Sequence, residues 1–291
     1  MGVNASDVMK LRNATGAGMM DSKNALEEAG GDMDKAAELL RKKGIVKAAK
    51  RADKVAAEGV VTNFVSNDGK VGALIEVNCE TDFVGKSDGF IDFAKQVAEV
   101  VAIKNPADMV ALQSAILSSG QMVGETANNL TLKIGEKISV RRFVRYESST
   151  GQVGSYLHGA KIGVMVELAG GNKELGIDVA MHVAATNPKA LDRTGVPTEL
   201  VNSEKEIYAE QLRQQKKPAN IIENIVKGKL DKFFSEVSLL EQPFIKNEDM
   251  KVEQLLGAQN AKVIRFVRYE LGEGIEKQEK NFAEEVAEQL K

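Results

Sequence analysis

This 291-residue chain contains one cysteine, two histidines and no tryptophan. The lone Cys79 excludes an internal disulfide and any zinc site built from several thiolates, and it fits a reducing compartment. With only His158 and His182, acid–base chemistry has few candidates. The sequence also has no Walker A loop, dinucleotide fingerprint or nucleophile elbow. We therefore expect no catalytic residue, no metal and no cofactor, and an enzyme is the weaker alternative.

Strong net charge and long apolar runs are also missing. The formal net charge of -3 and the aromatic content of 5% give no general electrostatic or stacking reason to bind nucleic acid. No apolar run approaches the length of a membrane span, and the first residues lack the layout of a signal peptide. We expect a soluble cytoplasmic protein without stable nucleic-acid binding. An RNA-binding scaffold is the alternative, and it would show steeply salt-dependent RNA affinity.

The first 54 residues have the pattern of three short helices separated by glycines. The helices are expected at residues 6–13, 19–29 and 33–43, with Asp32 as N-cap of the third and Gly44 just after its end. Together they predict a three-helix bundle. The lysines and arginine among the alanines of residues 45–54 indicate an exposed, partly helical linker whose charges are solvated.

The remainder of the chain contains an internal duplication. The hexapeptide Arg-Phe-Val-Arg-Tyr-Glu occurs at residues 142–147 and again at 265–270, and residues 59–77 resemble residues 151–168. Each half has the pattern of a hairpin, then helices, then a closing strand. This predicts an α+β fold with two similar subdomains, residues 55–148 and 149–273, each a small antiparallel sheet with helices on one face. Tyr146 and Tyr269 are expected in the core.

The second half also carries an insertion. Ser203 and Glu206 form a capping-box pair, Pro218 interrupts the helical pattern, and an apolar stripe follows. We expect a helical hairpin at about residues 198–235, its stripe forming the seam between the two helices. A polar C-terminal helix is expected at residues 274–291. Whether the hairpin mediates dimerisation stays open.

An aromatic residue stands beside a carboxylate where an apolar strand ends. Residues 72–77 have the pattern of a mostly buried strand, and Asp88 and Gly89 are expected to turn into a helix whose amphipathic run begins at Phe90. Phe83 is therefore expected on the connection between them, where side chains more often meet partners. The alternative is that the ring folds back onto the core of its own domain.

Two sequence runs carry a family resemblance. Residues 15–21 (Thr-Gly-Ala-Gly-Met-Met-Asp) and residues 78–84 (Asn-Cys-Glu-Thr-Asp-Phe-Val) resemble the two signatures of bacterial elongation factor Ts, the family of guanine-nucleotide exchange factors for elongation factor Tu. Further matches follow in order at residues 55–59, 154–159, 242–244 and 272–276. The family has an N-terminal three-helix (UBA-like) domain, a duplicated core, a helical hairpin and a C-terminal helical module, the same organisation as expected above.

The resemblance implies a mechanism and a set of contacts. Phe83 would enter the nucleotide-binding domain of elongation factor Tu near its magnesium site, and Asp82 would help to place the ring. The signature also includes Thr81 and Val84. The other partner contacts that it implies are Arg12, Met19, Met20, Lys23, Arg51, Ile134, Gly135, His158 and Phe282.

Several of these residues have a structural alternative. Met19 and Met20 are adjacent and cannot share a helix face, so one is expected in the core and the other as a flexible contact. Lys23 and Arg12 would ordinarily be solvated charges. His158 could instead cap a hairpin turn. Arg51 stands where relatives often have lysine, which keeps the charge but changes the hydrogen-bond geometry.

Overall fold

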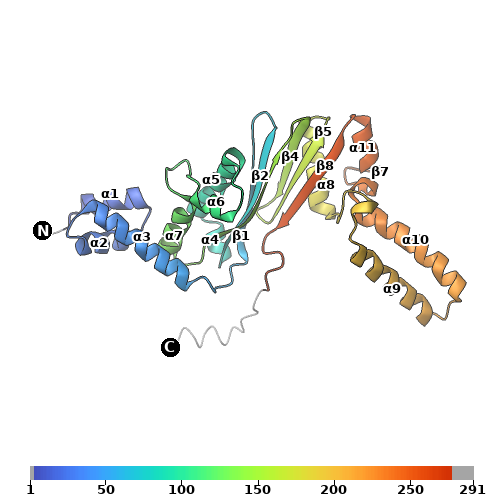
Figure 1. Cartoon of the computed structure of the whole chain (residues 1–291), viewed down its shortest axis with the longest axis horizontal. Helices are drawn as coiled ribbons and strands as arrows, with labels where there is room; N and C mark the ends of the chain where they lie inside the picture. The colour runs from blue at the N-terminus through green and yellow to red at the C-terminus, as the bar shows by residue number, and fades with distance from the viewer. Residues whose placement is uncertain (1–2, 277–291) are drawn as a thin grey trace.

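The computed structural model describes residues 3–276. This part of the chain is elongated: a three-helix bundle forms one end, two sheets form the middle and a helical hairpin forms the other end (Figure 1). The α+β class that the sequence predicts is confirmed. Among the helices of residues 3–276, none combines the length and hydropathy needed to cross a bilayer.

The N-terminal bundle consists of α1 (Ala5–Thr15), α2 (Met19–Glu28) and α3 (Met33–Lys50). The Asn4 side chain caps α1 by accepting from the Asp7 amide at 2.9 Å, and Gly16 ends it at a φ of 71°. Asp32 caps α3 as predicted. Small and branched side chains from all three helices form the core, and Leu132 of α7 (Val123–Ile134) packs against it.

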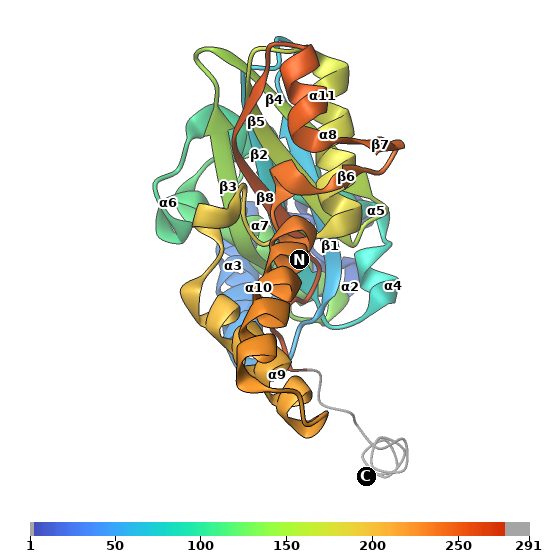
Figure 2. The ribbon, with the colours of Figure 1, turned by 90° about the vertical axis from the view of Figure 1, so that its right-hand side faces the viewer.

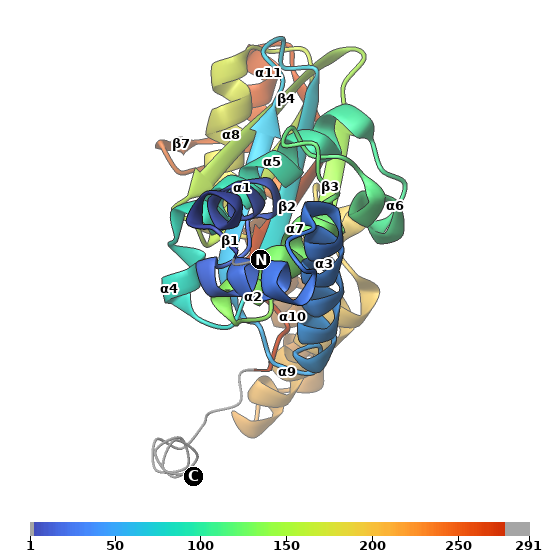
Figure 3. The same cartoon turned by 90° about the vertical axis from the view of Figure 1, so that its left-hand side faces the viewer.

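Helix α3 does not end at Gly44, and this prediction is wrong. The helix continues to Lys50, so most of the expected linker is helical. Gly44 is buried inside the helix, where a Cβ would lie 3.4 Å from the backbone oxygen of Asn128 on α7. The glycine allows α3 and α7 to approach closely, and the two helices lie side by side (Figure 3). Lys47 Nζ donates to the Leu132 carbonyl at 2.8 Å. Packing against α7 therefore outweighs the weak helix propensity of glycine.

The core contains two three-stranded antiparallel sheets that repeat each other. In each sheet the second strand in chain order lies in the centre. Gly72 pairs with Tyr146 in one sheet and Gly163 with Tyr269 in the other, and both central strands have a register shift just after a glutamate. The predicted duplication therefore extends to the strand register. The strands are β1 (Glu58–Val65), β2 (Val71–Cys79), β3 (Ser139–Glu147), β4 (Gly151–His158), β5 (Ile162–Ala169) and β8 (Lys262–Glu270).

The two sheets pack face to face between helices. Helix α5 (Asp88–Lys104) covers the outer face of the first sheet, and α8 (Lys173–Thr186) covers that of the second. Both helices end at an asparagine in the left-handed conformation, Asn105 and Asn187. The inner faces meet in a shared apolar layer (Figure 1). Helices therefore cover one face of each sheet, as predicted, because the other sheet occupies the opposite face.

The repeated hexapeptides interlock across this layer. The Arg142 guanidinium lies 4.1 Å from the Tyr269 ring centroid, and the Arg265 guanidinium lies 4.0 Å from that of Tyr146. Each copy thus supplies a cation for the aromatic ring of the other. Both tyrosines are buried, as predicted, and burial raises the pKa of Tyr146 to about 12. Arg142 also donates to the fully buried Glu76, at 2.6 Å.

The insertion projects from the second subdomain as a hairpin of α9 (Thr198–Gln214) and α10 (Ala219–Val237) (Figure 2). Its seam contains apolar side chains from both helices, as expected. The predicted capping box is wrong, because α9 begins at Thr198, directly after Pro197. Proline is well suited to precede a helix because its φ is fixed and it has no N–H to satisfy. Ser203 and Glu206 lie inside the helix.

The remaining elements are short. Helices α4 (Asp82–Gly85) and α6 (Met109–Ser114) belong to the first subdomain. The second contains two 3₁₀ turns, a two-stranded ribbon and one further helix: η1 (Arg193–Gly195), η2 (Leu239–Glu241), β6 (Pro243–Phe244), β7 (Asn247–Lys251) and α11 (Val252–Ala258). Most of the C-terminal helix expected at residues 274–291, including Phe282, lies outside the described residues.

Candidate partner-binding site

The run Thr81-Asp82-Phe83-Val84 forms the start of a single helical turn, α4. Thr81 is its N-cap, and its hydroxyl oxygen accepts from the Val84 amide at 3.4 Å. Val84 packs against the first core, and Gly85 is buried where a Cβ would lie 3.2 Å from the Gly59 backbone. One side of the turn is therefore anchored on β1.

The Phe83 ring points away from this anchor. It is 82% exposed, more than any other large hydrophobic side chain of the described residues. Because Val84 and Gly85 face inward, the helical geometry turns Phe83 outward. The alternative in which this ring packs on its own core is wrong. A single exposed apolar side chain is common at protein surfaces, but here the ring is held out on a short anchored turn.

Asp82 interacts with the next turn of the chain. Its carboxylate pairs with Lys86 Nζ, and this hydrogen bond holds the pKa of Asp82 below its usual value. Both side chains are largely exposed. A placing effect of Asp82 on the ring would act through this turn, because the Asp82 carboxylate pairs with Lys86.

The turn after α7 is joined to the N-cap of α4. Gly135 ends α7 at a φ of 89°, and Glu136 follows it. The Glu136 carboxylate accepts from the Thr81 amide at 3.0 Å and from the Thr81 hydroxyl at 2.8 Å. Ile134 is partly buried against the first core. The fold thus brings residues 134 and 135 next to residues 81–84.

Arg51 reaches the same place from the end of α3. Its Nη1 donates to both carboxylate oxygens of Glu80, at 2.7 and 2.9 Å. Glu80 also accepts from the Lys137 amide at 2.6 Å. Arg51 therefore has an internal partner, and its guanidinium helps to connect α3 with the base of the Phe83 turn.

His158 is exposed at the end of β4. The next residues form the turn between β4 and β5, and the Ala160 carbonyl accepts from the Val61 amide on β1 at 2.8 Å. Val61 lies two residues from Gly59, on which Gly85 rests. The His158 turn therefore lies at the same end of β1 as α4, although His158 itself interacts only weakly with Tyr156, at 3.5 Å.

Comparison with known proteins identifies the family. Residues 80–273 match the family model described as elongation factor TS. Over its full length the chain is 49% identical to the elongation factor Ts of Methylococcus capsulatus, covering 99% of that protein. It is 51% identical to that of Alkalilimnicola ehrlichii, again over all of this chain and 99% of the relative. Over 99% of its length it is 53% identical to that of Azoarcus sp. BH72, covering 96% of the relative.

The chain belongs to the elongation factor Ts family. The resemblance that the signatures carried is thereby confirmed, and so is a role as a translation elongation factor in protein biosynthesis. The matched region includes the Phe83 turn, strand β3 and the whole second sheet. The full-length relatives also cover β1, β2 and the N-terminal bundle.

The N-terminal residues that the family implies form a second surface on the bundle. Met19 is 44% and Met20 is 62% exposed, so the prediction that one of them is a core residue is wrong. Both stand in the first turn of α2, before its buried face begins at Ser22. Lys23 pairs weakly with Glu27, at 3.7 Å, and Arg12 is half-buried on α1. No interaction of the described residues links these four side chains to α4.

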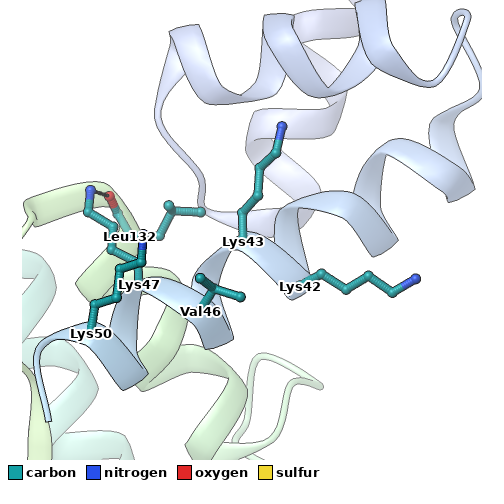
Figure 4. A pocket seen from close by; sticks show the side chains of 6 residues that line it. All are labelled: Lys42, Lys43, Val46, Lys47, Lys50 and Leu132. Carbon is teal, nitrogen blue, oxygen red and sulfur yellow. Dashed lines mark hydrogen bonds between the residues drawn. The ribbon is translucent and has the colours of Figure 1, made fainter.

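A shallow basic groove runs along α3 beside α7. Figure 4 shows its lysines pointing outward around an apolar floor, with Lys47 turned toward the Leu132 carbonyl. Lys42 and Lys43 are each paired with a glutamate, at 2.7 and 2.6 Å. Both lysines precede residues 45–54, for which solvated charges were expected, and within that segment Lys47 and Arg51 instead have internal partners. The lining residues are Lys42, Lys43, Val46, Lys47, Lys50 and Leu132.

The Phe83 turn presents an exposed apolar ring beside a paired carboxylate. Cys79 lies at the end of β2 and is buried as expected, and burial raises the pKa of its thiol to about 12. A thiol in that state is a poor nucleophile at neutral pH. Within residues 3–276, no group of three or more histidine, cysteine or carboxylate side chains is arranged to hold a metal ion.

Two carboxylates at the site were missed in the sequence. Glu80 lies in a signature run and Glu136 directly follows Gly135, but nothing in their spacing assigns them a role. They stand 56 positions apart, and only the antiparallel pairing of β2 with β3 brings them together. The one available signal was that each stands next to a residue with an implied partner contact.

Proposed function

We propose that this chain is the guanine-nucleotide exchange factor for elongation factor Tu. It binds the GDP-bound GTPase, inserts Phe83 into the nucleotide domain near the magnesium site, displaces magnesium and GDP, and is released by GTP. The observation that carries this proposal is the 82% exposed ring of Phe83 on an anchored turn, in a chain that belongs to the elongation factor Ts family.

Exchange of this kind is a matter of linked binding equilibria. The factor accelerates GDP release by binding the nucleotide-free state of the GTPase better than the GDP-bound state. The coupling is reciprocal, so the factor lowers GDP affinity by as much as GDP lowers the affinity for the factor. An incoming GTP molecule expels the factor by the same relation.

Burial of the Phe83 ring alone does not contribute enough free energy to stabilise the complex with the nucleotide-free GTPase. Burying one aromatic side chain contributes roughly 1.5 to 3 kcal/mol, which suits a wedge but leaves most of the interface energy to other residues. We assign the remainder to a broad surface that includes the bundle residues Arg12, Met19, Met20 and Lys23, the core residues Ile134, Gly135 and His158, and Phe282.

On this proposal the chain is not an enzyme, because it makes and breaks no covalent bond. It acts in the cytoplasm on a protein partner, and it binds neither nucleotide nor nucleic acid stably by itself. Contact between two exchange complexes through the α9–α10 hairpin is compatible with the proposal but is not required by it.

The test is the release of a fluorescent GDP analogue from elongation factor Tu with excess unlabelled nucleotide. Adding the chain in substoichiometric amounts is expected to accelerate release catalytically, because GTP frees the factor for further rounds. An unchanged release rate at every concentration of the chain would contradict the proposal. Omitting elongation factor Tu gives the control for direct nucleotide binding.

A further inference from the structure

The Phe83 turn is too short to hold its own shape. Helix α4 contains four residues, whereas isolated helices shorter than about 12 to 15 residues are marginal in water. Val84 and Gly85 anchor its inner side on the core. The outer side of the turn carries Asp82 and Phe83, and the core does not hold it. Contacts from another segment of the chain must hold it through Thr81, the N-cap of α4.

Glu136 supplies that support from the turn after α7. Its two carboxylate oxygens accept from two donors of one residue, the amide and the hydroxyl of Thr81, at 3.0 and 2.8 Å. A carboxylate that binds two donors fixes both the position and the orientation of the group that it holds. Thr81 is itself exposed, and its carbonyl also accepts from the buried Cys79 thiol at 3.1 Å.

The preceding residue is held in the same way. The Glu80 carboxylate accepts from the Lys137 amide at 2.6 Å and from Arg51 at 2.7 and 2.9 Å. Glu80 is therefore bonded to Lys137, and Thr81 is bonded to Glu136. We call these four residues the clasp. It joins the end of β2 to the start of β3 directly beneath the ring.

We propose that Glu136 is a positioning residue for nucleotide exchange, which acts by holding Thr81 and thereby fixing the direction of the Phe83 ring. This inference rests on the proposed function. A ring on a fixed turn enters its partner without first ordering the turn, whereas a ring on a loose turn loses part of its binding energy to that ordering. Docking through the broad surface does not depend on the clasp.

The experiment measures stimulated GDP release from elongation factor Tu over a range of concentrations of each variant. For Glu136→Ala we expect the maximal rate to fall about tenfold, the size expected for losing charge-assisted hydrogen bonds, while the half-saturating concentration changes less than about twofold. Glu136→Gln keeps an acceptor of the same length and is expected to recover most of the rate, but the shorter Glu136→Asp is not. Glu99→Ala on α5 is the matched control.

Hydrogen exchange gives a second readout in the free chain. Glu136→Ala is expected to speed exchange of the Thr81 amide and of the amides of residues 84–87, and to leave the buried centre of α5 unchanged. If Glu136→Ala destabilises the whole chain, Thr81→Val replaces it, because this variant removes the hydroxyl that Glu136 holds and alters no charge. It also removes the long N-cap contact to the Val84 amide. It is expected to lower the maximal rate about threefold.

The outcomes separate the two proposals. If the parent chain does not accelerate GDP release, the proposed function fails whatever the variants do. If the parent is active and Glu136→Ala and Thr81→Val match it in maximal rate, the positioning role fails and the proposed function stands. A rise in the half-saturating concentration at an unchanged maximal rate would also overturn the positioning role, because it would make Glu136 a docking contact.

Discussion

Two features decide what Phe83 can do: the two residues after it, Val84 and Gly85, face inward, and Thr81 before the turn is held at both its amide and its hydroxyl. The ring therefore needs no rearrangement to reach a partner. Asp82 is engaged with Lys86, and on our proposal the clasp at the base of the turn directs the ring.

The second histidine gives a prediction about stability. His182 is buried, the Ile245 amide donates to its Nδ1 at 3.3 Å, and its Nε2 therefore carries the proton donated to Gln242 at 2.9 Å. Burial outweighs the bond to Gln242 and lowers the pKa of His182. Below about pH 6.5 the unfolded chain takes up a proton that the folded chain does not, so the free energy of unfolding falls as the pH falls.

Urea denaturation at pH 7.5 and pH 5.5 checks this. The limiting effect of one such group is about 1.4 kcal/mol per pH unit, and His182→Gln is expected to lose less stability between the two pH values than the parent. His158→Gln, which removes the other histidine at an exposed position, is the matched control. Equal losses in His182→Gln and the parent would show that this side chain does not contribute.

At the scale of the elements, a pair of equivalent glycines allows the two sheets to pack closely. A Cβ at Gly72 would lie 2.6 Å from Val153 Cγ1, and a Cβ at Gly163 would lie 2.5 Å from Val61 Cγ1. These two glycines are equivalent positions of the duplication, each opposite the tyrosine of its own sheet. Each one makes room for a side chain of the opposite sheet.

Gly72→Ala and Gly163→Ala are each predicted to lower the free energy of unfolding by about 1 to 3 kcal/mol, because the added methyl group overpacks the shared layer. Chemical denaturation measures the change. Gly89→Ala on α5 is the control, since a Cβ there meets no atom within 4 Å. A loss at Gly89 as large as that at Gly72 would show that backbone freedom, and not space between the sheets, sets the cost.

Hydrophobic periodicity and the repeated hexapeptide were sufficient to predict the sheets, the covering helices and the hairpin. The errors were at helix ends, where a local signal competes with packing. Gly44 resembles a helix end but lies against α7, and Ser203 with Glu206 resembles a start inside a helix that begins at Thr198. The residues around each of these positions in the sequence do not include the contacts that determine where the helix begins or ends.

At the scale of the whole molecule, one helix serves both surfaces that the family implies. Helix α7 packs against the N-terminal bundle through Leu132 and then ends at Gly135, next to the carboxylate that holds Thr81. The bundle, with Met19, Met20 and Lys23, and the Phe83 turn are thus carried on one continuous support (Figure 1).

Met19→Ala combined with Lys23→Ala is predicted to weaken association with elongation factor Tu about three- to tenfold and to leave the fold intact, because both side chains are exposed. A binding titration measures the affinity, and circular dichroism measures the fold. Met9→Ala on α1 supplies the comparison, since Met9 is 41% exposed on the same bundle but outside the implied surface. Unchanged affinity in the double variant would remove these residues from the interface.

The residues of the candidate site could be named from the sequence only because the family signatures mark them. The exposure of Phe83 could be predicted from its place on a connection. The contacts of Glu80 and Glu136 that hold the turn could not. Glu80 and Glu136 meet only after β2 and β3 pair, and Arg51 joins them because α3 continues past Gly44. Contacts between distant segments of this kind have no local pattern.

The most direct test of the central claim is the maximal rate of labelled GDP release from elongation factor Tu with the parent chain, with Phe83→Ala and with Val110→Ala. Val110 is 73% exposed on α6 and matches Phe83 as an exposed apolar side chain outside the site. We predict that Phe83→Ala lowers the stimulated rate by about ten- to a hundredfold and that Val110→Ala does not change it. Equal rates for Phe83→Ala and the parent would contradict the account.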